Sequence, residues 1–225
     1  MLHMDKAGLL ELIAKINTTD EHVAVSTETA GWKARREAEA LTDPALFPLL
    51  QKIIEEHDGK QKDQREIRNA AYFIFGRLMQ ASFEEGACAF FLRQLGAETD
   101  KYILSFMLDR VHDWWKRAGK TIPAGLDISN ILTLAKDDRR SVRHSAIRAL
   151  GACPREESRD MLRSYLLQED EKAYQYEIYY ANIAMQGIGE PEDIPFLERF
   201  LKSRRPDIKM TAQYAIQFIQ ERNHL

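Results

Sequence analysis

The sequence predicts an all-α fold, a solenoid of about five to six helix pairs stacked side by side. The composition favours helices, because only 11 of the 225 residues are glycine and 44% are hydrophobic. Two apolar patterns alternate along the chain, and turn-forming residues fall between them. A chain of this kind buries its core between neighbouring pairs and needs neither a metal nor a disulfide to fold.

The first apolar pattern marks one helix of each predicted pair. It consists of two adjacent apolar residues, two variable residues, and then one or two further apolar residues, which fall on one face of a helix. Its copies begin at Leu49, Phe91, Ile131, Met161 and Phe196. Each copy predicts the first helix of a pair.

The second pattern marks the partner helix. A bulky residue is followed by small or apolar residues four, seven and eight positions later, and the clearest copy is Val142, Ala146, Ala149 and Leu150. The other copies are led by Ile67, Ile103, Tyr180 and Ile208, of which those at Ile103 and Tyr180 are weaker. A small residue on the buried face lets the second helix approach the first closely.

Capping and breaking residues set the predicted helix boundaries. Asp43 and Asp127 can accept from the first amides of a helix, and Gly151 falls where a helix should end. We expect helices over residues 5–17, 30–41, 44–57, 62–80, 83–96, 100–117, 128–136, 139–151, 155–168, 171–187, 192–203 and 206–222.

Two polar segments interrupt this rhythm, over residues 18–29 and 118–126. The helix pairs resume after each, so neither segment is expected to separate domains. We predict one domain over residues 1–225, with a helical cap over 1–42 and repeats over 43–225.

Three segments of the sequence resemble a known family of helical repeats. Residues 137–151, Asp-Asp-Arg-Arg-Ser-Val-Arg-His-Ser-Ala-Ile-Arg-Ala-Leu-Gly, resemble the second helix of a HEAT repeat, of the bacterial short-repeat kind also found in phycobilisome lyases. Residues 63–71 and 205–212 are similar, and the resemblance extends over about residues 43–225. It implies a right-handed, armadillo-type superhelix of antiparallel helix pairs.

The resemblance also implies a stacked ladder of charges, in which an acidic residue before the second helix meets a basic residue after its first bulky position. Asp137 and Arg143 fit this arrangement, whereas Arg68 and Lys209 keep only the basic half. We therefore expect an interrupted ladder with a structural role.

Stacked repeats leave one face of each second helix free, and these faces line the concave surface that such proteins use for binding. The outward positions lie two and six residues after the leading bulky residue. They are Asn69, Phe73, Ser105, Asp109, His144, Arg148, Asn182, Gln186, Met210 and Tyr214. Their mixed chemistry suits a protein or peptide better than a track of phosphates. The sequence thus predicts a non-enzymatic protein- or peptide-binding scaffold.

Trp114 and Trp115 form the densest aromatic cluster, beside His112, Asp113 and Lys116. Adjacent helical residues diverge by about 100°, so one tryptophan could be exposed as a contact hot spot. The alternative is that both are partly buried in packing.

Two other functions stay open at this stage. Basic residues precede several second helices, including Arg139, Arg140, Arg204 and Arg205, and could touch DNA as in the helical-repeat alkylpurine glycosylases. Against this, residues 168–171 are acidic and the net charge is −3. A lyase or chaperone for a tetrapyrrole-bearing protein rests on the repeat resemblance alone.

Signals for cofactors, metals and targeting are weak. Cys88 and Cys153 sit among apolar residues and are expected to be small core residues without a disulfide. Gly119-Lys120-Thr121 lacks the earlier glycine of a phosphate-binding loop, and no histidine pair has metal-ligand spacing. No cofactor or metal is predicted, no apolar run could cross a membrane, and a cytoplasmic location is expected.

Overall fold

The computed structural model describes residues 4–18, 27, 29–118, 123 and 125–224. Every regular element in these ranges is helical, as the sequence predicts. The α-helices are α1 (Lys6–Ile16), α2 (Ala30–Glu39), α3 (Leu46–Glu56), α4 (Lys62–Ala81), α5 (Glu85–Ala97), α6 (Lys101–Ala118), α7 (Ser129–Leu134), α8 (Arg140–Leu150), α9 (Glu156–Leu166), α10 (Gln175–Ile188), α11 (Ile194–Glu198) and α12 (Pro206–Asn223). Most of the two predicted polar loops, 18–29 and 118–126, lies outside the described residues.

Two predicted helices differ from those observed. Residues 171–174 form a turn instead of the start of α10, because the Asp170 carboxylate accepts from the backbone N–H of Ala173 at 2.9 Å. The predicted helix over 192–203 is an α-helix only in α11, with 3₁₀ turns over Pro191–Asp193 and Arg199–Lys202. Elsewhere the ends agree closely; for example, Asp127 accepts from Ser129 N at 2.8 Å beside the start of α7.

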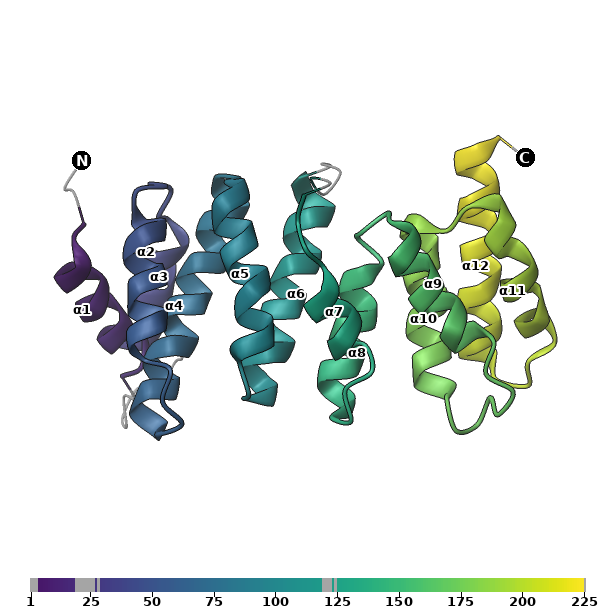
Figure 1. Ribbon diagram of the computed structural model, residues 1–225, viewed down its shortest axis with the longest axis horizontal. Coiled ribbons are helices and arrows are strands. Elements are labelled where there is room, and N and C mark those ends of the chain that lie inside the picture. The colour runs from purple at the N-terminus through teal and green to yellow at the C-terminus, as the bar shows by residue number, and fades with distance from the viewer. Residues whose placement is uncertain (1–3, 19–26, 28, 119–122, 124, 225) are drawn as a thin grey trace. The chain divides into compact units, whose positions relative to one another are not determined.

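The described chain forms two compact units, residues 1–91 and 92–225, whose border falls within α5. In unit 1, α1 packs on α2 and α3 packs on α4, and both α1 and α2 also contact α4 (Figure 1). Aromatic rings fill its centre. Phe75 meets Phe47, Phe90 and Phe91 at ring-centroid distances of 4.9, 5.6 and 5.5 Å, and Tyr72 meets Phe91 edge-on at 5.8 Å.

Unit 2 has two layers of helices (Figure 1). The second helices α6, α8, α10 and α12 contact one another in chain order, and α7, α9 and α11 pack against them from one side as their partners. The core facing this layer contains buried small residues, namely Ala146, Ala149, Ala181, Ala184, Ala212 and Ala215. A solenoid needs this arrangement, since each pair then buries its apolar side on the next.

Glycine permits the closest approach between α8 and α10. A Cβ atom on Gly151 would lie 2.7 Å from the Cα of Ala184, and one on Gly187 would overlap the carbonyl oxygen of Gly151. Both positions are closer than any van der Waals contact allows. The two helices can therefore pack this closely only because neither position carries a side chain.

Arginines connect helices of successive repeats in unit 2. Arg139 donates to the carbonyl of Thr99 just after α5 at 2.6 Å, and Arg199 donates to that of Leu166 at the end of α9 at 3.0 Å. Arg222 donates to the carbonyls of Gln186 and Gly189 at the end of α10. These carbonyls have no partner inside their own helix, so a cation from the next repeat both satisfies them and offsets the helix dipole.

Asp137 and Arg143, the two residues that fit the charge ladder, do not form a side-chain ion pair with each other in the described chain. Asp137 instead accepts from the N–H of Arg139 and from its guanidinium, both at 2.8 Å, and this hydrogen bonding lowers the pKa of the Asp137 carboxyl. Arg143 donates to the carbonyl of Asp137 at 2.6 Å and pairs with Glu177 on α10 at 2.7 Å. The charges therefore bridge α8 to α10 across two repeats, because the nearer arginine, Arg139, already satisfies Asp137.

Candidate binding groove

The open side of the second-helix layer in unit 2 is hollowed by two pockets. The Lys116 pocket has a volume of about 590 Å³ and is lined by His112, Lys116, Arg148, Gly151, Ala152, Pro154, Ile183, Ala184, Gln186, Gly187, Ile188 and Phe218. The Tyr180 pocket has a volume of about 720 Å³ and is lined by Lys101, Asp109, Arg139, Arg140, Ser141, His144, Ser145, Arg148 and Tyr180. Arg148 lines both, so we treat the two as one groove across α6, α8, α10 and α12.

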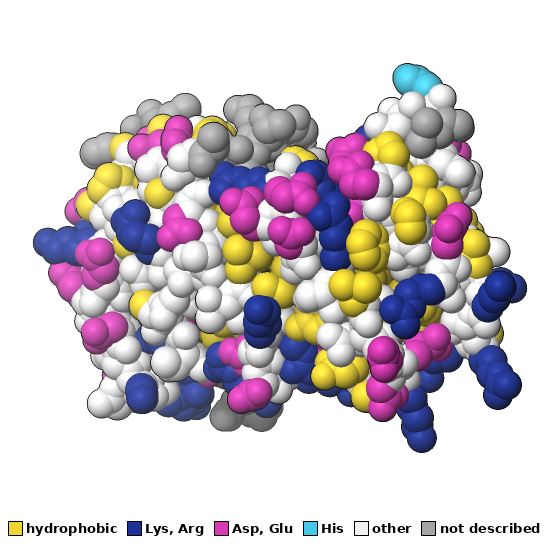
Figure 2. Space-filling view, turned by 45° about the vertical axis from the view of Figure 1, so that its right-hand side comes forward, with side chains coloured by type: hydrophobic (Ala, Val, Ile, Leu, Met, Phe, Trp, Pro, Cys, Tyr) yellow, Lys and Arg dark blue, Asp and Glu magenta, His cyan; other side chains and the backbone are white. Residues whose placement is uncertain are grey.

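The surface chemistry of unit 2 is mixed. Figure 2 shows hydrophobic side chains gathered over its C-terminal helices, with basic and acidic side chains between them. Three of the exposed apolar residues stand four positions apart on α12, which places Met210, Tyr214 and Phe218 on one face of that helix. Each is 48% exposed. Phe218 is the one that lines the Lys116 pocket.

Between the two pockets, Arg148 is shared by two carboxylates of α6. Its guanidinium lies 3.3 Å from Asp109 and 3.3 Å from Asp113. Burial raises the pKa of Asp109, although Arg148 opposes this effect. Burial would also raise the pKa of Asp113, but the hydrogen bond with His112 at 3.1 Å and the charges of Arg110 and Arg148 together lower it. Arg148 is thus largely neutralised by its own neighbours.

A second cluster lies at the Tyr180 pocket. The ring of His144 sits between those of Tyr180 and Tyr176, with centroids 4.8 and 5.9 Å away, and its Nε2 is 3.2 Å from the Glu177 carboxylate. Burial lowers the pKa of His144, so the ring is mainly neutral at pH 7. Burial would raise the pKa of Glu177, but hydrogen bonds from Arg143 and His144 lower it. Glu177 is therefore the anion that anchors this cluster.

The predicted outward residues on α6, α8 and α12 are exposed or half-buried, and their part in binding stays a prediction. Asp109, His144 and Arg148 line the Tyr180 pocket, and Met210 and Tyr214 are exposed on α12. Ser105 is half-buried on α6, and its hydroxyl has no hydrogen-bond partner within the described chain. These residues are placed as the outward positions of a second helix should be.

On α10 the predicted outward position Asn182 is wrong, because the buried face begins two residues earlier than predicted. Asn182 is fully buried, and its amide donates to the carbonyl of Ile208 at 3.3 Å and to the Thr211 hydroxyl at 3.2 Å. The leading buried residue is Ile178 instead of Tyr180, so Tyr180 faces the groove, whereas Ala184 is buried against Gly151 at the edge of the Lys116 pocket. Gln186 still lines the Lys116 pocket, but from a position nearer the end of the helix.

Asn69 and Phe73 belong to unit 1. Asn69 is exposed, and Phe73 is half-buried beneath the guanidinium groups of Arg35 and Arg77, each 5.5 Å from its ring centroid. Their part in binding stays a prediction.

The tryptophan pair is not an exposed hot spot. Trp114 and Trp115 are 3% and 4% exposed, with ring centroids 6.0 Å apart. Both rings are packed inside the protein, as the second of the two sequence-based interpretations predicted. The exposed side of this turn of α6 is formed by Lys116, with His112 and Asp113 half-buried beside it.

Sequence reasoning missed one row of groove residues. Continuing the outward spacing by one more helical turn, to ten residues after Val142 and Ile208, gives Ala152 and Phe218, both of which line the Lys116 pocket. On α10 it gives the lining residue Ile188 only when counted from Ile178, which the structure identifies as the leading residue. The same extension on α6 gives Asp113. The signal was therefore present, but the predicted column ended one turn early.

Other chemistry predicted from sequence can be located. Cys88 and Cys153 are buried thiols, and burial raises the pKa of Cys153. Gly119-Lys120-Thr121 lies outside the described residues. In the described ranges, no group of three His, Cys, Asp or Glu side chains could hold a metal ion, and none of the helices placed there has the length and apolarity to cross a bilayer.

The basic turns proposed for DNA contact are partly engaged in the protein itself. Arg139 binds Asp137 and the Thr99 carbonyl, and Arg205 lies 3.7 Å from Asp207. Arg140 lies over the Tyr176 ring at 3.6 Å. These side chains have structural partners, which reduces the positive charge that they could offer to phosphates.

Comparison with known sequences finds a similarity over most of the groove helices. Residues 128–217, from the predicted start of α7 into α12, match the family described as HEAT repeats. Over these residues the chain is similar to HEAT repeats. No curated protein sequence matches the chain, and the phycobilisome-lyase type stays a sequence-based prediction.

Solved structures agree with the fold. A designed armadillo repeat protein in complex with peptide (KR)4 is 14% identical, with a TM-score of 0.51 over 94% of this chain and 99% of that one. A computationally designed armadillo repeat protein for modular peptide recognition is 16% identical, with a TM-score of 0.53 over 93% of this chain and 99% of that one. At these identities the likeness concerns the fold alone, and the predicted all-α repeat solenoid is confirmed.

Proposed function

We propose that the chain is a non-enzymatic binding module whose HEAT repeats hold an extended peptide, or an extended segment of a partner protein, along the groove of unit 2. The observation that carries this proposal is the continuity of the groove. Two pockets of about 590 and 720 Å³ join at Arg148 and draw their lining from four successive second helices. An elongated ligand could contact several repeats at once.

The lining suits a peptide. Exposed aromatic and thioether side chains on α12 offer the contacts that are enriched at the centres of protein interfaces, and Gln186 and Tyr180 offer hydrogen bonds beside them. Two armadillo-type structures of similar fold are titled for a bound peptide and for peptide recognition, which makes an extended peptide a fitting occupant.

The charged groups of the groove support binding more than catalysis. Asp109 and Asp113 pair with Arg148, and Glu177 pairs with Arg143. These pairs connect α6 to α8 and α8 to α10, so the charged side chains of the groove already have structural partners. The expected cytoplasmic location is part of this proposal.

The test uses the purified chain as bait in an extract of its native cell. Arg148→Gln combined with Tyr214→Ala should abolish capture of the main partner, because it removes the side chain that lines both pockets and an exposed ring one turn before Phe218 on α12. Glutamine is preferable to an acid at position 148, since a third carboxylate beside Asp109 and Asp113 would repel them.

The matched control is Leu167→Ala, which removes an equally exposed apolar side chain just after α9, outside both pockets. This variant should capture the partner as well as the original chain does. Circular dichroism should give the same helicity for all three proteins. Retention of the partner by the double variant would contradict the groove assignment.

A further inference from the structure

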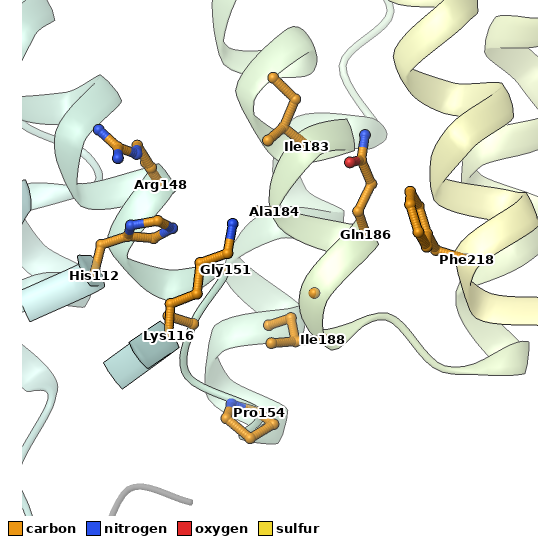
Figure 3. Close-up of a pocket in the computed structure, with 12 residues that line it drawn as sticks. His112, Lys116, Arg148, Gly151, Pro154, Ile183, Ala184, Gln186, Ile188 and Phe218 are labelled. Carbon is orange, nitrogen blue, oxygen red and sulfur yellow. The ribbon is translucent and has the colours of Figure 1, made fainter. Parts of the chain in front are cut away.

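The Lys116 pocket has one charged side and one apolar side. Figure 3 shows His112 and Lys116 facing Gln186 and Phe218 across the opening, with the Lys116 ammonium directed between them. The apolar side is formed by Ile183, Ile188 and Phe218. At about 590 Å³ the pocket falls within the range of sites that hold a few side chains or a small ligand.

Lys116 supplies the uncompensated charge of this pocket. The charged residues that line it are all basic, and of these Arg148 is neutralised by Asp109 and Asp113. Burial lowers the pKa of His112, so its ring carries little charge at pH 7. Within the described residues, no carboxylate lies within ion-pair distance of Lys116, which is exposed on α6.

The helix ends around the pocket do not cancel this charge. The carbonyls of Arg148, Ala149 and Leu150 at the end of α8 accept from the N–H groups of the three following residues. At the end of α10, Arg222 donates to the carbonyls of Gln186 and Gly189. Because these acceptors are satisfied, an anion beside Lys116 meets no row of bare carbonyls.

The apolar side of the pocket includes a hydrophobic ring that is exposed to water. Phe218 is 48% exposed although it ends the apolar row on α12 and faces the pocket (Figure 3). Covering such a ring releases water from it and stabilises a complex in proportion to the apolar area removed from water. A ligand that offered only a negative charge would leave this surface uncovered.

We infer that the Lys116 pocket binds an acidic–apolar peptide segment, in which an Asp or Glu side chain stands next to a bulky apolar one. The carboxylate pairs with Lys116, and the apolar side chain packs against Phe218 and Ile188. This inference deepens the proposed function and rests on it, because it names the chemistry of the segment that occupies one end of the groove.

The first experiment selects random 12-residue peptides, displayed on phage, against the immobilised full chain. The enriched sequences should carry Asp or Glu within two positions of Leu, Ile or Phe. One enriched peptide is then synthesised with a fluorescent label, together with a version in which the acid is Lys and a version in which the apolar residue is Ser. Both altered peptides should bind about tenfold more weakly in anisotropy titrations.

The second experiment changes the pocket. Lys116→Glu and Phe218→Ala should each weaken the enriched peptide about tenfold, whereas Lys116→Arg should stay within about twofold because it keeps the charge. The matched controls are Lys172→Glu and Leu167→Ala, exposed residues of unit 2 outside the pocket, which should also stay within about twofold. All the altered side chains are exposed or partly so, and circular dichroism confirms that each variant is folded.

Three results would overturn the inference: no enrichment, enrichment of basic peptides, or equal binding by Lys116→Glu. Tighter binding of free decanoate than of any peptide would assign the pocket to a small carboxylate and overturn it as well. If the inference fails while Arg148→Gln with Tyr214→Ala still abolishes partner capture, the proposed function stands with a different segment chemistry. If that double variant also retains the partner, both fail.

Discussion

The two units hold similar helix pairs together by different means. Unit 1 surrounds Phe75 with three further aromatic rings, those of Phe47, Phe90 and Phe91. Unit 2 instead uses alanine and glycine between its second helices, and connects them with buried or half-buried ion pairs such as that of Arg143 with Glu177. A helix pair can be stabilised by ring volume or by close approach with polar connections.

This difference bears on function. Small residues bring α8 and α10 close enough for Gly187 to contact the Gly151 carbonyl, and side chains such as Tyr180 are directed to the open side of the layer. The pockets of the groove lie in this unit. Close packing through small residues thus leaves the large side chains available for a ligand.

The largest loss of stability should come from substitutions in the aromatic core of unit 1. Phe75→Ala should reduce the free energy of unfolding by about 4 kcal/mol, because it removes a fully buried ring and leaves a cavity among three others. Phe75→Leu should cost about 1 kcal/mol, since it keeps most of the volume. Urea denaturation followed by circular dichroism measures both, and a loss below about 1 kcal/mol for alanine would show that the rings contribute little.

The second largest loss of stability should come from breaking the ion pair between Asp193 and Arg163 in unit 2. Asp193 is fully buried, pairs with Arg163 at 2.5 Å and accepts from the Glu190 N–H at 2.8 Å. Asp193→Ala should cost about 3 kcal/mol, because it leaves a partly buried guanidinium and an amide without their partner. Asp160 binds the same arginine at 3.0 Å but is 65% exposed, so Asp160→Ala should cost less than about 0.5 kcal/mol. Equal losses in urea titrations would contradict the assigned importance of burial.

Close approach itself can be tested with one methyl group. Gly151→Ala should cost about 2 kcal/mol, because its Cβ would meet the backbone of Ala184 at 2.7 Å. A Cβ atom on Gly86 in α5 would meet no atom within 4 Å, so Gly86→Ala should be neutral or stabilising by up to about 1 kcal/mol. The fluorescence of the buried Trp114 and Trp115 reports on unit 2 during unfolding, and no loss for Gly151→Ala would disprove the tight contact.

The smallest effect should be the pH dependence of the Arg143–Glu177 pair. The pKa of Glu177 is lowered from its ordinary value of 4.5, so its pairing stabilises the fold fully above that pH and is lost as pH falls through the lower, folded-state pKa. Glu177→Gln should cost about 1 kcal/mol at pH 7 and should lose less stability than the original chain between about pH 5 and 3. Parallel curves for the two proteins would exclude Glu177 as the titrating group.

The sequence predicted the fold in detail because helix periodicity and caps are local signals. Asp127 and the repeating apolar pairs placed the helices to within a few residues. The predicted outward positions are exposed or half-buried where alanines mark the buried face, as after Val142 and Ile208. They failed on α10, since Asn182 occupies a buried alanine position and its amide is satisfied by Ile208 and Thr211. A pattern of polar and apolar residues cannot reveal a buried amide with partners.

The connections between repeats were not predictable in the same way. The arginines were visible, but their acceptors are backbone carbonyls, which every residue carries. Arg143 also pairs with Glu177, although Asp137 is nearer in the sequence, because the Asp137 carboxylate is already bound by Arg139. Which donor binds which acceptor depends on their positions in space, which the sequence alone does not give.

In each of these arginine-to-carbonyl contacts the arginine comes later in the sequence than its acceptor, so it is synthesised later. Arg139, Arg199 and Arg222 lie 40, 33 and 36 residues after the carbonyls that they bind. At ribosomal rates of about 5–20 residues per second, each helix end waits roughly 2 to 8 s in water before its arginine has been made. In unit 2 these three carbonyls therefore stay hydrated during synthesis until the next repeat has been made.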